Sequence, residues 1–515
     1  MLMKIHFLLC SMIFLLSGCK ETDEKKNQPV AFKKPNIVFL IADDWSCPHA
    51  GAYGDPVVRT PTFDRLAREG ALFLNAYCAS PSCSPSRASI LTGRYPHQLE
   101  SAGNLWSIIP DKFPNWVTIL SGKGYYTGST RKGWGPGDYL SGGYTENPAG
   151  KRYNSFKEFF EQRPKDQPFT FWFGSSDPHR DYTPNTGLLA GMSLDQVVVP
   201  EFLPDLPCVR NDMLDYYFEV ERFDRECGQI IAMLEKAGEL DNTIIVMTSD
   251  NGMPFPRAKA NVYDYGTRMP LAIRWPEKIK KSTVINDFVS FVDFAPTLLS
   301  AAGSEPDPSM SGKSIWPLFS QPATPTGREQ IFLERERHAN ARKGDLSYPV
   351  RAVRNHDFLY IRNVMPERWP AGDAQVHRSV GQWGDVDNSI TKFLIMNMEN
   401  KTATTGTDYF QLSFGLRPAE ELYAVRDDPF QLQNLASDAS HQNTLIQMRN
   451  QLQQWMEDTG DPRATDPTTH YWDTVKYVPT YQFKNVDITA EIGAYRIISP
   501  TGNSTTGAPG ISCLD

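Results

Sequence analysis

The chain has 515 residues and a mass of 58.1 kDa, which indicates several domains or one large α/β domain with an appendage. Its composition, 40% hydrophobic, 12% aromatic and 22% charged, is typical of a globular protein and not of a disordered or collagen-like chain. The net charge of −8 argues against a nucleic-acid-binding protein, and eight cysteines are too few for a disulfide framework.

The N-terminus predicts an export signal followed by a tether. Lys4 precedes an apolar run, Ile5 to Leu16, that is too short to span a bilayer as a mature helix. The run ends in Leu16-Ser17-Gly18-Cys19, which resembles the bacterial lipobox; a simple cleaved signal is the alternative. We therefore expect a signal peptide at 1–18, lipidated Cys19 and a polar tether at 19–34. The expected location is the periplasm or cell surface, as an outer membrane lipoprotein.

Three apolar segments of the body predict buried strands of a parallel sheet: Asn36–Ala42, Phe169–Phe173 and Thr243–Thr248. Between the last two, hydrophobic residues from Met213 to Leu234 recur at helical spacing, and Gly238 follows as a stop. Strands that alternate with helices predict an α/β fold with a large, mostly parallel central sheet flanked by helices. Ligands of such sheets bind at the carboxyl ends of the strands.

Oxygen-bearing side chains follow the first and third strands. Asp43 and Asp44 end the first strand, and Asp250 and Asn251 end the third. Either pair alone is typical of a turn, but two pairs at equivalent strand ends favour a metal site. Oxygen ligands suit Ca²⁺, or less favourably Mg²⁺, rather than zinc. His179 follows the second strand and is expected at the same edge.

Cys83 lies in the segment from Pro81 to Gly93. Pro85 and Ser86 predict the entry to a helix and Gly93 its end, so Cys83 is expected just before a helix N-terminus, where anions are favoured. The residues alone leave open a small buried cysteine or a disulfide with Cys78. The order Cys83-x-Pro85-Ser86-Arg87, followed by Ala-x-x-Leu-Thr-Gly-Arg, resembles the signature of the type I, formylglycine-dependent sulfatases.

The resemblance extends over most of the mature chain. Further similar segments are Asn36 to Asp44, Thr60 to Gly70, Thr248 to Gly252 and Glu421 to Leu435. Asp177 to Arg180 and Asp250 to Pro256 resemble the branch that contains the N-sulfoglucosamine sulfohydrolases, although many bacterial relatives of that branch act on O-sulfated polysaccharides. The resemblance implies an alkaline-phosphatase-like catalytic domain at 35–310, a smaller C-terminal α+β subdomain at 325–460 and a tail at 461–515.

The resemblance also implies a mechanism. A separate maturase would oxidise Cys83 to formylglycine, and one hydroxyl of its hydrate would attack sulfur while the other later expels sulfate. His179 would protonate the leaving oxygen. The implied calcium ligands are Asp43, Asp44, Cys83, Asp250 and Asn251, and the implied cations around the sulfate are Arg87, Lys132 and Lys259, with Arg257 as the alternative to Lys259. Substrate contacts are expected at His49, Arg180, Arg335 and His338.

One position departs from the family pattern. Members usually show Gly-Lys-x-His where this chain has Arg131-Lys132-Gly133-Trp134. The replaced histidine usually helps the aldehyde to re-form, and tryptophan has no basic site. His49 is the nearest candidate by sequence to act instead, and water is the alternative.

The C-terminal part carries fewer signals. Val350–Val353 and Phe358–Ile361 predict a hairpin around Asn355-His356-Asp357, and Leu445–Trp455 predicts a helix. Glu334 to His338 is dense in charge and is either a solvated surface or a sugar-contacting loop. From Tyr471 onwards the chain either wraps the body or frays.

The function that these patterns favour is that of a secreted sulfatase acting on a sulfated polysaccharide or its oligosaccharides. Cleavage of an N–S bond is the main alternative. A phosphatase or phosphodiesterase of the same superfamily would need more histidine ligands for two zinc ions, and a silent carbohydrate-binding lipoprotein is suggested only by Trp134. Expected partners are the sulfated saccharide, the maturase and a membrane reached through the lipid anchor alone, with no nucleic acid.

Overall fold

The computed structural model describes residues 33–319, 326–401, 403, 406–474, 485–498 and 513. Pro35–Asp515 cluster as one compact unit. The expected signal peptide, the lipidation site Cys19 and most of the tether lie outside the described residues. The domain boundaries near 310, 325 and 460 stay predictions.

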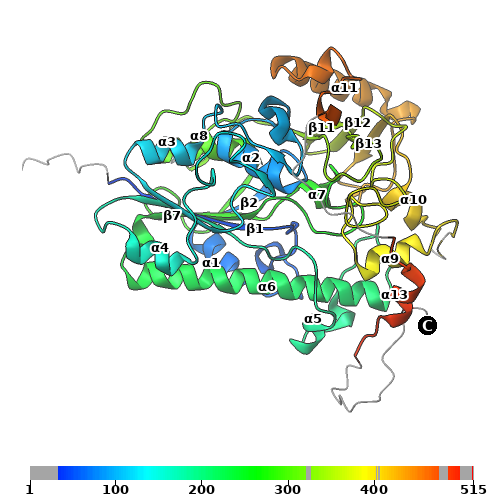
Figure 1. Cartoon of the computed structure of the whole chain (residues 1–515), viewed down its shortest axis with the longest axis horizontal. Coiled ribbons are helices and arrows are strands. Elements are labelled where there is room, and N and C mark those ends of the chain that lie inside the picture. The colour runs from blue at the N-terminus through cyan, green and yellow to red at the C-terminus, as the bar shows by residue number, and fades with distance from the viewer. Residues whose placement is uncertain are drawn as a thin grey trace, which may run out of the picture. The chain divides into compact units, whose positions relative to one another are not determined.

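A seven-stranded sheet in the order β4-β6-β1-β7-β8-β2-β9 forms the centre of this unit (Figure 1). All neighbouring strands are parallel except β8, which is antiparallel to β7 and β2, so the predicted mostly parallel sheet is confirmed. The strands are β1 Asn36–Ala42, β2 Ala71–Tyr77, β4 Tyr126–Arg131, β6 Phe169–Gly174, β7 Thr243–Ser249, β8 Leu271–Arg274 and β9 Thr283–Ser290. A separate short pair joins β3 Ser107–Ile108 to β5 Gly137–Asp138.

Helices cover both faces of this sheet (Figure 1). One face carries α1 Pro61–Glu69, α4 Phe156–Gln162 and α6 Pro207–Lys236, and the other carries α2 Cys83–Thr92, α3 Trp116–Gly122 and α8 Phe294–Ala301. Strand β1 is buried on both sides, because Val38 and Leu40 join one hydrophobic core while Ile37 and Phe39 join the other. Two buried faces explain why this strand is a continuous apolar run.

Helix α6 begins at Pro207 and not at Met213, where the apolar periodicity starts. Proline fits the first turn of a helix, which has no intrahelical acceptor for its missing N–H, so the helix extends beyond its amphipathic part. The remaining helices outside the second sheet are α5 Thr186–Leu189, α7 Asp264–Thr267, α9 Ile390–Met396, α10 Tyr409–Phe414, α12 Tyr471–Thr474 and α13 Ile488–Ala494.

A second, antiparallel sheet follows in the C-terminal part. Its strands, in order, are β10 Gln330–Arg335, β11 Val350–Asn355, β12 Phe358–Asn363 and β13 Glu420–Ala424. Strands β11 and β12 form the predicted hairpin, and helix α11 Gln442–Asp458 packs on the sheet through Leu445, Met448 and Leu452. The predicted helix at Leu445–Trp455 is therefore confirmed and is longer at both ends.

The charge-dense segment from Glu334 to His338 is buried at every position. Glu334 binds His97 with a distance of 2.7 Å between Oε2 and Nδ1. Glu336 accepts hydrogen bonds from Arg351 at 2.7 Å and from Arg463 at 2.8 Å. A solvated surface is the wrong interpretation of this segment, because its charges are paired with residues far along the chain, as buried charges must be.

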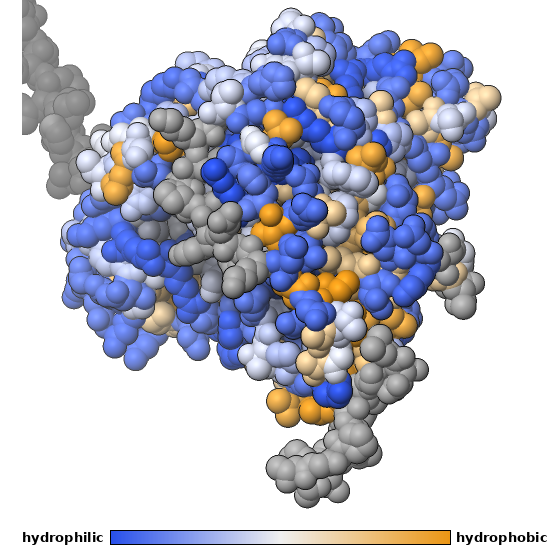
Figure 2. Space-filling view, turned by 45° about the vertical axis from the view of Figure 1, so that its right-hand side comes forward, coloured by the Kyte–Doolittle hydropathy of each residue, from blue (hydrophilic) through white to orange (hydrophobic). Residues whose placement is uncertain are grey.

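The described parts of the tail wrap the body. The Trp472 side chain is fully buried, and Ile492 and Ile497 join the hydrophobic core to which α6 contributes. A disulfide links Cys208, in α6, to Cys513. The face shown in Figure 2 is largely hydrophilic, with hydrophobic residues in small groups. Within the described part of the chain, no helix has the length and apolar character needed to cross a membrane.

Candidate active site

The carboxyl ends of β6, β1 and β7 bring the polar segments to one edge of the sheet. Ile41 of β1 pairs with Gly174 of β6, and Ala42 pairs with Ser249 of β7, so the three strands end at the same level. The Asp43 amide donates to the Asp177 carbonyl at 2.9 Å, which ties two of the turns together. The expected convergence of these segments is therefore present.

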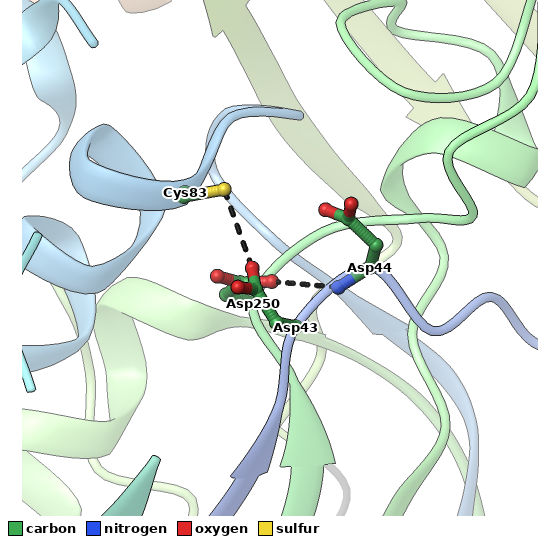
Figure 3. Close-up of side chains that lie close together, drawn as sticks. All are labelled: Asp43, Asp44, Cys83 and Asp250. Carbon is green, nitrogen blue, oxygen red and sulfur yellow. Dashed lines mark hydrogen bonds between the residues drawn. The ribbon is translucent and has the colours of Figure 1, made fainter. Parts of the chain in front are cut away.

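Four buried side chains meet at this edge (Figure 3). Asp43, Asp44, Cys83 and Asp250 each place one ligand atom within 4.8 Å of the others. The Cys83 sulfur lies 3.4 Å from Oδ1 of Asp43, and the Asp44 amide donates to Oδ1 of Asp250 at 3.2 Å. Cys83 is the first residue of α2, so this helix starts earlier than Pro85 and Ser86 suggest. Cys78 and Cys83 are both free, which rules out a disulfide between them.

This arrangement fits a hard divalent cation. Three carboxylates that converge so closely repel one another unless positive charge lies between or beside them. The amide of Asn251 donates to Asp44 at 2.7 Å, while its carbonyl oxygen Oδ1 is buried without a hydrogen-bond partner. A buried unpaired oxygen is rare and calls for an explanation, and a metal ligand is one. Asp43, Asp44, Asp250 and Asn251 could therefore hold a metal ion.

Three cations surround the carboxylates, as the sequence predicts. Arg87 Nε donates to Asp250 at 2.7 Å, Lys132 Nζ donates to Asp43 at 2.5 Å and Lys259 Nζ donates to Asp44 at 2.7 Å. Arg257, the alternative to Lys259, instead donates to the carbonyls of Leu412 and Gln431. Lys259 is therefore the basic residue of its segment that reaches the site.

Burial and charge act in opposite directions on the ionisable groups here. Burial alone would raise the pKa of Asp43, but Lys132, His179 and Arg87 outweigh it and hold that pKa well below its usual value. Burial dominates at Asp250, where it raises the pKa to about 6. Burial, together with the charge of Asp43, raises the pKa of the Cys83 thiol well above its ordinary value. A thiol in this state is a poor nucleophile, because the thiolate is the reactive form.

His179 lies where these buried groups meet a cleft. Its Nδ1 lies 2.6 Å from the Arg180 carbonyl, an acceptor, so Nδ1 carries the proton of the neutral ring. Its Nε2 lies 3.9 Å from Asp44, and the side chain is 34% exposed. His179, Lys132 and Asp43 line a cleft of about 570 Å³. Nε2 is therefore free to exchange a proton with a molecule bound in the cleft.

Asp387 belongs to this site, although no sequence motif indicates it. Its carboxylate accepts a hydrogen bond from Lys259 Nζ at 2.8 Å and lies within 4.8 Å of ligand atoms of Asp44 and His179. The loop before α9 carries it, and Lys392 fixes this loop by donating to the Val386 carbonyl at 2.7 Å. Asp387 lies in the long segment between β12 and β13. No periodicity or motif in this segment places Asp387 near Lys259, so the contact is seen only in the tertiary structure.

Trp134 takes a packing role beside Cys83. Its indole Nε1 donates to the Ser84 carbonyl at 3.1 Å, and its ring is buried and borders the cleft. His338 contacts the residue before Cys83, with 2.8 Å between its Nδ1 and Ser82 Oγ, and burial lowers the His338 pKa to about 3.

The structure places His49, Arg180 and Arg335 in contacts of other kinds. His49 lies among tyrosines, 3.3 Å from the Tyr216 hydroxyl, and is not one of the side chains grouped around Cys83. Arg180 forms two hydrogen bonds to Asp212, at 2.7 and 2.8 Å. Arg335 is buried and paired with Asp385. Roles of these three in substrate binding stay predictions.

Cys83 thus lies at a helix N-terminus, next to a carboxylate cluster and three cations, of which Arg87 and Lys259 are buried and Lys132 is partly exposed. Residues 35–304 match the sulfatase family, and residues 257–373 match the C-terminal region of N-sulphoglucosamine sulphohydrolase. The chain belongs to the sulfatase family and is a sulfuric ester hydrolase.

Two relatives show how far this similarity extends. The human N-sulphoglucosamine sulphohydrolase is 30% identical over 516 residues, covering 89% of this chain and 95% of that protein. An ulvan-active sulfatase of Formosa agariphila is 28% identical over 501 residues, covering 85% of this chain and 77% of that protein.

Two solved structures share the fold. A protein in complex with its substrate D-glucosamine-2-N,6-O-disulfate has a TM-score of 0.60 at 21% identity, covering 84% of this chain and 99% of that one. The phosphonate monoester hydrolase of Agrobacterium radiobacter has a TM-score of 0.56 at 17% identity, covering 83% and 96%. At these identities the likeness concerns the fold alone.

Proposed function

We propose that this protein is a secreted lipoprotein sulfatase that hydrolyses sulfate esters of a sulfated polysaccharide or its oligosaccharides. The observation that carries the proposal is the position of Cys83, 3.4 Å from Asp43 and beside the cations Arg87 and Lys132 that pair with the carboxylate cluster. The names of the two relatives, an ulvan-active sulfatase and an N-sulphoglucosamine sulphohydrolase, describe enzymes that act on sulfated saccharides, which supports this class of substrate.

Cys83 is the nucleophile in this proposal after a maturase converts it to formylglycine. Its motif supports the conversion. The raised pKa of the unmodified thiol disfavours direct attack by cysteine, because the thiolate is the reactive form. Calcium held by Asp43, Asp44, Asp250 and Asn251 would neutralise negative charge and orient the nucleophile.

The chain's own residues supply the remaining steps. Arg87 is anchored by Asp250 and by the carbonyls of Lys132 and Gly133, so it holds its position without substrate. Lys132 and Lys259 lie beside Asp43 and Asp44 and stabilise negative charge on the sulfate as it is transferred. His179 acts from its doubly protonated form: it gives the Nε2 proton to the leaving oxygen and becomes neutral, while its Nδ1–H stays bound to the Arg180 carbonyl.

Desulfation of defined saccharides tests the function. The protein, produced together with a maturase, should release sulfate from at least one O-sulfated saccharide, and the Cys83→Ala variant should not. The similarity to the human sulphohydrolase favours N-sulfated glucosamine as the second candidate, so N-sulfated and O-sulfated forms of one sugar belong in the same panel. Hydrolysis of phosphate or phosphonate esters without any sulfate release would contradict the proposal.

The location is also a proposal. The Leu16 to Cys19 motif supports lipidation, and the disulfide between Cys208 and Cys513 supports folding in an oxidising compartment. Cys19→Ala should move the protein from the membrane fraction to the soluble fraction without changing its turnover. Full-length protein that stays in the cytoplasm would contradict this location.

A further inference from the structure

The cleft beside His179 extends beyond the residues that surround Cys83. It is lined by Asp43, Lys132 and His179, and also by Trp134, Tyr139 and Arg152. Its volume of about 570 Å³ lies within the range of sites that enclose drug-sized ligands, which is more than one sulfate group requires. The cleft therefore has room for saccharide next to the group that is cleaved.

The cations of this cleft differ in how they are paired. Lys132 binds Asp43, Arg180 binds Asp212, and Arg131 binds Glu226 through two hydrogen bonds of 2.6 Å. Arg222 is held by Asp177 and Glu219. Arg152 is exposed and has no ion pair with any described residue. Among the described residues that line this cleft, it is therefore the cation that a ligand can engage without first breaking an ion pair.

The position of Arg152 is fixed by the edge of the central sheet. The backbone of Arg152 pairs with Ser129 of β4 in a parallel bridge. Two backbone hydrogen bonds flank it: the Ser129 amide donates to the Lys151 carbonyl at 2.7 Å, and the Tyr153 amide donates to the Ser129 carbonyl at 2.8 Å. The Tyr153 side chain is buried in the core. Successive side chains of an extended segment point to opposite sides, so a buried Tyr153 leaves Arg152 on the cleft side.

The part of the cleft lined by Trp134 and Asn147 is also held in place. Asn147 accepts a hydrogen bond from the Trp134 amide at 2.9 Å and donates to the Trp134 carbonyl at 2.9 Å. Asp181 also lines the cleft, without an ion pair to a described residue, but it belongs to the segment that carries His179. Among the described residues, the two unpaired charges that line the cleft therefore lie on different segments: Asp181 on the segment that carries His179, and the Arg152 guanidinium on the segment next to β4.

We propose that Arg152 forms a subsite for a second anionic group, a sulfate or a carboxylate, on a sugar next to the one that loses sulfate. This inference rests on the proposed function and makes it more specific, because the preferred substrate is then an oligosaccharide with at least two anionic groups. Guanidinium binds both groups through paired hydrogen bonds, which give geometric selectivity as well as affinity.

Steady-state kinetics on a matched substrate set test the subsite. The set contains an activated aryl sulfate, a monosulfated disaccharide with a neutral neighbouring sugar, and the same disaccharide with a sulfate or a carboxylate on that sugar. Arg152→Ala should raise KM about tenfold for the two substrates with a second anion, and leave the other two unchanged. The tenfold effect should shrink at high salt. Lys151→Ala is the matched control, since Lys151 is exposed but does not line the cleft.

Equal effects of Arg152→Ala on all four substrates, or none on any, would overturn the subsite. Calorimetric binding of the same disaccharides to the Cys83→Ala protein, with and without Arg152→Ala, separates this failure from failure of the proposed function. Loss of about tenfold in affinity for the dianionic disaccharides would support the subsite even if no sulfate is released. Unchanged affinity would contradict it.

Discussion

The Lys259 ammonium donates to the Asp387 carboxylate at 2.8 Å, and the same nitrogen lies 2.7 Å from Asp44. Lys259 therefore bridges Asp44 of the carboxylate cluster and Asp387 of the insertion, the segment between β12 and β13. Burial alone would lower the pKa of Lys259, but Asp387 and Asp44 outweigh it and raise that pKa well above its usual value. The insertion thus keeps a charged lysine at the site.

Asp387→Asn should lower kcat/KM for an activated aryl sulfate about 10- to 100-fold, because Lys259 loses one of the two carboxylates that hold it. The substitution keeps the shape of the side chain, and the melting temperature should change little. In a double-mutant cycle, adding Asp387→Asn to Lys259→Ala should cost little further activity, since both changes remove the same interaction. Additive losses would contradict a role through Lys259. Glu399→Gln, exposed in the same insertion, is the control.

Metal binding should depend on Asp250. Calcium should raise the melting temperature of the purified, chelator-treated protein, because a ligand that binds only the folded state stabilises it. Asp250→Ala should abolish this rise and reduce turnover at least about 100-fold. Elemental analysis should find calcium in the active protein. Zinc in its place, with no calcium or magnesium, would favour the phosphatase alternative.

His49→Ala should affect stability more than catalysis. His49 is buried against Tyr216 and Tyr217, and burial lowers its pKa to about 4. Truncation leaves a cavity and removes a hydrogen bond, which should cost about 2 kcal/mol in the free energy of unfolding. Turnover of the properly folded variant should stay unchanged. Slow turnover with accumulation of a sulfated enzyme, seen by intact mass, would instead support His49 as the base that replaces the family histidine at Trp134.

Acid should destabilise the protein partly through Asp385. Burial alone would raise the pKa of Asp385. Arg342 and Arg335 outweigh this effect and lower the pKa of Asp385 from 3.8 to about 2. Because the folded pKa lies below the unfolded one, the stabilisation is complete above about pH 4 and is lost as the pH falls towards 2. Asp385→Asn should cost about 3 kcal/mol at pH 7, since two buried arginines lose their partner. Its unfolding free energy should also fall less steeply between pH 4 and 2 than that of the parent protein.

Urea unfolding at each pH measures this difference, with exposed Asp427→Asn as the control. A parallel pH dependence in Asp385→Asn and the parent protein would show that other carboxylates carry the acid response.

The sequence predicts the parts of the site that follow strands. Strands β1 and β7 are buried on both faces, so the sequence shows them as continuous apolar runs. The residues that follow two adjacent parallel strands must meet at the same edge of the sheet. Asp43, Asp44, Asp250 and Asn251 are found this way. Cys83, Arg87 and Lys132 are instead predicted from the resemblance of their motifs to the family.

The parts that depend on distant packing could not be predicted. Asp387 reaches Lys259 from a loop that Arg335 and Arg342 hold through Asp385 and that Lys392 holds through the Val386 carbonyl. His49 follows Asp43 and Asp44 closely in sequence, yet its ring lies among the tyrosines of α6. Proximity along the chain does not fix the direction in which a loop side chain points.

The modification state of residue 83 is the sharpest test of the proposed sulfatase chemistry. The measurement is peptide mass spectrometry of fully active protein produced with a maturase, read at the peptide that contains Cys83. We expect an aldehyde at position 83 and sulfatase activity that rises in proportion to the modified fraction. Full activity in protein whose Cys83 is entirely unmodified would contradict a formylglycine nucleophile.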